Sequence, residues 1–75
     1  MNYDKELDAR GLACPLPVVK TRKALNEMAP GQVLRVLSTD AGSMADMKAF
    51  AEQTGHELLS SSQEGSTYVF VIKRK

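Results

Sequence analysis

LDARGLACPLPVVKTRKAL, Leu7–Leu25, gives the clearest indication of the fold, because within it a strand pattern passes through a turn into a helix pattern. Cys14, the only cysteine in the chain, stands between that turn and a pair of prolines, Pro15 and Pro17. Small and apolar residues then recur at spacings of three and four, which predicts a helix over residues 18–29: Val18, Thr21, Ala24, Leu25 and Met28. The Pro-Gly pair at 30–31 ends this helix.

Further elements follow on both sides of this stretch. We predict strands over residues 5–10, 32–39, 56–62 and 66–74, with a hairpin turn at 63–65, and a second helix over residues 43–54. Ser43 and Asp46 match the capping-box pattern at the start of that helix, and Gly55 matches a left-handed cap at its end. Its predicted buried stripe is Met44, Met47, Phe50, Ala51 and Thr54.

This order of elements, β-α-β-α-β-β, predicts an α/β (α+β two-layer sandwich) domain that occupies residues 1–75. Two right-handed strand–helix–strand crossovers place both helices on one face of a four-stranded mixed sheet. The strand over 32–39 has apolar residues on both faces and is expected to be central. The carboxyl ends of the first three strands then share an edge, where we expect the Cys14 turn, the Asp40–Ser43 turn and the Ser62–Ser66 hairpin.

The composition of the chain argues against several classes of function. The net charge of +1 provides no global attraction to DNA or anionic lipid, and four aromatic residues are few for a nucleic-acid stacking platform. The longest apolar run, residues 68–72, is far too short to span a membrane. The first residues are polar, unlike a secretion signal, and one cysteine cannot form an internal disulfide. We therefore expect a reduced, cytoplasmic protein.

The position of Cys14 suggests a nucleophile. If Cys14 is the N-cap, its sulfur can accept the Leu16 N–H, and the helix dipole lowers its pKa. Three basic residues on the helix and one before the turn would add positive potential: Lys20, Arg22, Lys23 and Arg10. The alternative is that Leu16 is the N-cap, because residues before proline resist helical geometry, and the dipole effect then weakens.

Each candidate residue also has a plainer interpretation. Free cysteine is often a small buried hydrophobe, although the flanking prolines favour a functional Cys14. The basic group Lys20, Arg22 and Lys23 is either a docking patch for an acidic partner or a solvated helix face. One cysteine and one histidine cannot supply an ordinary metal site, so no metal is expected. His56 is expected at the sheet edge opposite Cys14, with a structural role.

Aspartates near the turns are expected to be structural too. Asp8 precedes the first turn and Asp40 follows the central strand, and either could anchor turn N–H groups. A catalytic role is less favoured, because a carboxylate beside a thiolate would disfavour the thiolate. No general base for Cys14 is visible in its sequence neighbourhood.

The chain resembles the TusA/SirA-type sulfur carrier proteins over essentially its whole length. The resemblance lies in the following features: the Leu7-Asp8 pair, Arg10-Gly11-Leu12, the Cys-Pro-x-Pro motif Cys14–Pro17, the Ala24-Leu25 pair, the Pro30-Gly31 stop, and a second signature over residues 39–59. Ala41 departs from it, since many relatives have proline there.

The resemblance implies a fold and a function. The fold would be similar to the C-terminal domain of translation initiation factor three. Cys14 would accept sulfane sulfur as a persulfide from a cysteine desulfurase or rhodanese-like donor and relay it to an acceptor of the DsrE or TusBCD kind. The chain would act as a protein co-substrate more than as a stand-alone enzyme, with no cofactor beyond the transient persulfide. It would serve tRNA thiolation, molybdenum cofactor synthesis or sulfur oxidation.

Residues around Cys14 would support this relay. Arg10, Gly11, Pro15, Leu16 and Pro17 would shape the turn, with Asp40 and Ser43 in the second turn. We expect a monomer that does not bind membranes or DNA. Two alternatives come from other classes: a nucleic-acid-binding regulator, suggested by the basic tail Lys73–Lys75, and a single-thiol redox sensor.

Overall fold

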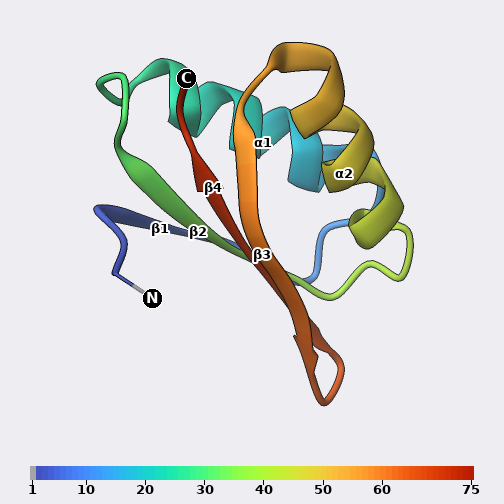
Figure 1. The fold of residues 1–75 in the computed structure, drawn as a ribbon. Coiled ribbons are helices and arrows are strands. Elements are labelled where there is room, and N and C mark those ends of the chain that lie inside the picture. Colours follow the sequence, from blue (N-terminus) through green and yellow to red (C-terminus); the bar gives the residue numbers. More distant parts are fainter. Residues whose placement is uncertain (1) are drawn as a thin grey trace.

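A computed structural model describes residues 2–75 as two helices packed on one face of a four-stranded sheet (Figure 1). The elements are β1 (Lys5–Ala9), α1 (Leu16–Asn26), β2 (Val33–Ser38), α2 (Ser43–Thr54), β3 (Glu57–Glu64) and β4 (Thr67–Lys73). The strand order is β1-β2-β4-β3. β1 and β2 are parallel, and β4 runs antiparallel to both of its neighbours. The predicted fold class is therefore confirmed, with β1, β2 and β3 pointing the same way.

The core lies between the sheet and the helices. β2 is central, as expected, and its side chains alternate: Leu34, Val36 and Ser38 are fully buried under the helices. Phe70 and Ile72 of β4 pair with Val36 and Leu34 in the register and are also fully buried. The two-residue period of the strands thus places one apolar row under both helices.

α1 begins differently from either arrangement considered for the sequence. Its N-cap is Pro15, whose carbonyl accepts the Val19 N–H at 3.1 Å and so starts the helical ladder. The Leu16 N–H donates to the carbonyl of Ala13 at 2.9 Å instead of to the Cys14 sulfur. Neither Cys14 nor Leu16 is the N-cap, because this tight turn already satisfies the Leu16 N–H. Cys14 lies one residue before the N-cap. α1 also ends at Asn26, three residues before the predicted end.

The start of α2 also corrects the prediction. Gly42 is the N-cap, and the capping box between Ser43 and Asp46 does not form. Ser43 is instead buried and donates its hydroxyl to the Asp40 carbonyl at 2.7 Å. Ser43 thus takes the inward position one turn before Met47, and Met44 lies 38% exposed at the margin of the stripe instead of in the core. Gly55, with φ of 83°, is the predicted left-handed cap.

The β3–β4 hairpin is longer than predicted. β3 continues to Glu64, so the loop is only Gly65 and Ser66. The ends of the two strands project past the rest of the sheet (Figure 1). The hairpin turn shares the sheet edge of the other two turns but extends beyond them.

Candidate functional site

Cys14 is exposed at the corner where β1 leads into α1. Two interactions shape the turn before it. Asp8 accepts the Arg10 backbone N–H at 3.1 Å and its guanidinium at 2.9 and 3.0 Å, and these contacts lower the pKa of Asp8 to about 2. Gly11 has a φ of 83°, a backbone conformation that residues with a side chain rarely adopt. The expected anchoring role of Asp8 in the turn is therefore present in the structure.

The second turn lies against the first. The Gly11 N–H donates to the Thr39 hydroxyl at 2.9 Å, which ties the Cys14 turn to the end of β2. Asp40 contributes its backbone carbonyl to the turn, accepting from the Ser43 N–H at 3.1 Å as well as from its hydroxyl. The Asp40 carboxylate does not anchor the turn through Oδ2, which is buried without a hydrogen-bond partner among the described residues.

Two carboxylates approach the cysteine sulfur. The Sγ atom of Cys14 and carboxylate oxygens of Asp40 and Asp46 all lie within 4.8 Å of one another. Asp46 belongs to the first turn of α2, and its carboxylate is free for this position because it caps no backbone donor. Three donor atoms fall short of the four that structural zinc takes, and we assign no metal to them.

These carboxylates reverse the expected electrostatics of Cys14. The pKa of the Cys14 thiol is raised, first by the Asp46 carboxylate as hydrogen-bond acceptor, then by burial, and then by the charges of Asp46 and Asp40. The predicted lowering of this pKa is wrong, because the sulfur lies beside two negative groups and outside the helix cap. The resting group near neutral pH is therefore the thiol.

The predicted basic patch divides between two sides of α1. Arg22 lines a cavity of about 220 Å³ together with Cys14. Lys20 and Lys23 line a different cavity, beside Lys5 and Leu7 of β1. Residues two apart on a helix point about 200° apart, whereas residues three apart share a face. Arg22 is therefore the only member of the patch that lines the Cys14 cavity.

The remaining predicted residues are those of the Cys-Pro-x-Pro motif, His56 and the hairpin turn. Pro15 lines the cavity with Cys14, Pro17 is buried in the first turn of α1, and Leu16, the first residue of α1, is 45% exposed. His56 lines the neighbouring cavity and is not among the residues that line the one at Cys14, in line with its expected position away from the thiol. The Ser62–Ser66 hairpin lines neither cavity, so two of the three predicted segments form the site.

Sequence reasoning did not identify Asp46 as a site residue. Its only signal was an acidic side chain in the first turn of a helix that starts at the same sheet edge as the Cys14 turn. That position was interpreted as a capping box.

Comparisons with known proteins agree with this geometry. A family model described as sulfurtransferase TusA matches residues 5–74. The chain belongs to the TusA family. The sulfur carrier protein TusA of Allochromatium vinosum is 53% identical over 73 residues, which cover 97% of this chain and 96% of that protein. A Bacillus subtilis protein with the name "Putative sulfur carrier protein YrkI" is 47% identical over 74 residues, which cover 99% of each chain.

A solved structure supports the TusA fold. The crystal structure of a SirA-like protein from Desulfitobacterium hafniense superimposes with a TM-score of 0.83, at 28% identity, over 93% of this chain and 96% of that one. The resemblance to TusA/SirA-type proteins is therefore confirmed. No helix among residues 2–75 combines the length and apolar character that crossing a membrane requires.

The electrostatics of this TusA site predict the effect of Asp46→Asn. The substitution removes the main cause of the raised Cys14 pKa, so the thiol should ionise at lower pH. We expect alkylation by iodoacetamide at pH 7 to accelerate about threefold, because the gain in thiolate outweighs the loss in its nucleophilicity. The measurement is the alkylation rate against pH. Glu52→Gln, which removes an exposed carboxylate outside the Cys14 cavity, is the control. If the alkylation rate of Asp46→Asn reached half its maximum at the same pH as the wild type or at a higher one, Asp46 would not be the cause of the raised Cys14 pKa.

Proposed function

We propose that this TusA-family chain is a sulfur carrier in which Cys14 holds the sulfur as a persulfide. The observation that carries the proposal is an exposed sulfur on a corner built by two tied turns, at the mouth of an open cavity. A carrier must present its sulfur to two different proteins in turn, and an open, rigid corner suits that task better than an enclosed pocket.

The transfer step needs no external oxidant. The Cys14 thiolate attacks the outer sulfur of a donor persulfide, so that a new sulfur–sulfur bond forms on Cys14. The sulfur–sulfur bond of the donor breaks, and the donor cysteine leaves as a thiolate. Cys14 must first lose its proton to solvent, because its pKa is raised and only the thiolate attacks sulfur. Delivery to an acceptor thiol is the same reaction in the opposite direction.

Three exposed apolar residues lie near the starts of the two helices. Leu16 is 45% exposed, Val19 of α1 is 54% exposed and Met44 of α2 is 38% exposed, all within the first turns of the two helices. Such a surface suits contact with a partner protein. We propose a cysteine desulfurase or rhodanese-like protein as the donor and a DsrE- or TusBCD-like protein as the acceptor. These partners, and not this chain, would determine the destination of the sulfur.

The redox-sensor alternative fits less well. Redox-sensor thiols often act with a resolving cysteine, and Cys14 is the only cysteine in the chain.

Reversible loading tests the proposal. The protein is mixed with a cysteine desulfurase and cysteine, and its intact mass is followed. We expect a gain of about 32 Da, or a multiple of it for longer sulfur chains, that disappears when dithiothreitol is added. Protein alkylated beforehand with iodoacetamide is the control and should not gain the sulfur. A wild-type mass that stays unchanged with both a desulfurase and a rhodanese donor would refute the proposal.

A further inference from the structure

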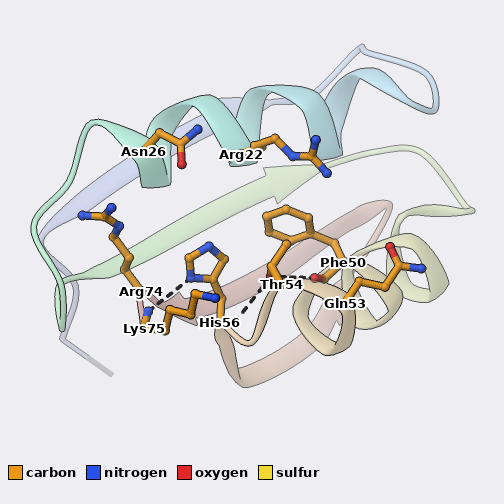
Figure 2. A pocket seen from close by; sticks show the side chains of 8 residues that line it. All are labelled: Arg22, Asn26, Phe50, Gln53, Thr54, His56, Arg74 and Lys75. Carbon is orange, nitrogen blue, oxygen red and sulfur yellow. Dashed lines mark hydrogen bonds between the residues drawn. The ribbon is translucent and has the colours of Figure 1, made fainter.

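A second cavity continues the one at Cys14. It has a volume of about 370 Å³ and lies between α1, α2 and the end of the chain: its lining residues are Arg22, Asn26, Phe50, Gln53, Thr54, His56, Arg74 and Lys75 (Figure 2). Arg22, Phe50 and Gln53 line both cavities. The two cavities are therefore parts of one interhelical groove, with Cys14 at one end and the C-terminal residues at the other.

The two ends of the interhelical groove carry opposite charge. Asp46 lines the Cys14 end, and Asp40 lies within 4.8 Å of the same sulfur. Two cationic side chains, those of Arg74 and Lys75, line only the far end, while Arg22 lines both cavities, and no described residue that lines the far cavity is acidic. Pro15, Val18 and Ala49 make the Cys14 end largely apolar otherwise.

Hydrogen bonds hold the backbone at the far end and the guanidinium of Arg74. Arg74 pairs through its backbone with Gly31 and Gln32, at 2.9 Å in each case, and its guanidinium donates to the Met28 carbonyl. The Lys75 N–H donates to Nδ1 of His56 at 3.2 Å (Figure 2). This end is therefore an ordered basic surface.

Aromatic side chains lie between the two ends of the interhelical groove. The Phe50 ring lies 5.8 Å from the His56 ring and 5.8 Å from the Arg22 guanidinium carbon. The pKa of His56 is lowered by burial and by the charges of Lys75 and Arg74, as expected beside uncompensated cations. The far end is thus suited to negatively charged groups.

We propose that the interhelical groove binds an extended segment of a partner protein, with a cysteine of that segment at Cys14 and acidic side chains at Arg74 and Lys75. The inference rests on the proposed function and adds the chemistry of the partner. Charge complementarity supports the occupant, and the carboxylates at Asp40 and Asp46 repel an acidic group from the Cys14 end. The charge gradient therefore selects one direction of binding, with the acidic residues remote from the cysteine.

A peptide probe tests this inference without any sulfur donor. Its cysteine is activated as a 2-pyridyl disulfide and is joined by glycine–serine spacers of several lengths to three glutamates. Cys14 attacks the peptide sulfur, forms a mixed disulfide and releases pyridine-2-thione, whose absorbance gives the rate. At low salt we expect the best glutamate peptide to react about fivefold faster than its glutamine counterpart. This preference should decline as salt is added.

Two charge reversals on exposed lysines provide the matched comparison. Lys75→Glu should abolish the preference for glutamate, whereas Lys20→Glu should preserve it, because Lys20 lines the cavity beside β1. Equal rates for the two peptides, or equal losses in both variants, would overturn the proposal. The proposal would also be overturned if single-stranded RNA slowed the reaction of the wild type but not of Lys75→Glu, while the glutamate and glutamine peptides reacted at the same rate. A failed sulfur carrier would be recognised separately, by the absence of a mass gain with a persulfide donor.

Discussion

Cys14→Ser is expected to abolish sulfur loading. Serine keeps the size of the side chain but supplies no sulfur that can form a persulfide, and Cys14 is the only cysteine in the chain. The variant should show no gain of mass after exposure to a persulfide donor, a loss of at least about a hundredfold against the wild type. Intact mass spectrometry of both proteins under identical conditions measures the effect.

The fold of this variant should be preserved. Cys14 is exposed and caps no helix, so its replacement removes no buried contact and no backbone hydrogen bond. We expect its free energy of unfolding to remain within about 0.5 kcal/mol of the wild-type value, the usual range for surface substitutions. A Cys14→Ser protein that is folded and still gains sulfur would show that another group carries it.

Phe70→Ala is expected to produce the largest loss of stability. Phe70 is fully buried in β4, pairs with Val36 and Ser61 across the sheet, and faces both helices. Truncation of a buried phenylalanine costs about 3–5 kcal/mol. A domain of this length is stable by only about 4–11 kcal/mol. Urea unfolding should therefore show a protein that is partly unfolded or close to it.

A milder variant keeps this prediction measurable if Phe70→Ala does not fold. Phe70→Leu retains most of the buried volume and should lose about 1–2 kcal/mol. Val19→Ala, at an exposed position of α1, should change stability by less than about 0.5 kcal/mol. A loss below about 1 kcal/mol for Phe70→Ala would contradict the central place of this ring in the core.

The sequence was sufficient to predict the elements and their layers, because these depend on periodicity. The alternation through Leu34 and Val36 and the three- and four-residue spacing of Thr21 and Leu25 each follow from one local geometry. Gly55 was predictable for the same reason, since a left-handed cap is a local requirement that glycine meets.

The helix starts were not predictable in this way. The residue that caps a helix depends on which acceptors the N–H and O–H donors at the helix start find. Here these donors found acceptors within the turns. The Leu16 N–H reached Ala13, and the Ser43 hydroxyl reached Asp40. Pro15 and Gly42 therefore became the caps although neither offers a side-chain acceptor.

The electrostatics of the site required the tertiary structure. Cys14 and Asp46 are far apart in sequence and meet only because both helices begin at the same sheet edge. Basic residues near Cys14 in sequence suggested a lowered pKa, whereas the carboxylates near it in space raise it. The separation of Arg22 from Lys20 and Lys23, by contrast, follows from helical geometry and was available from the sequence.

The central claim is that one sulfur atom arrives on Cys14 and leaves from it. Its most direct test is tandem mass spectrometry of protein loaded from ³⁴S-labelled cysteine by a desulfurase, before and after addition of an acceptor thiol protein. The account predicts that the label is attached to the Cys14 side chain and departs when the acceptor is added. Label found on any other residue, or a Cys14 peptide that never acquires it, would contradict the account.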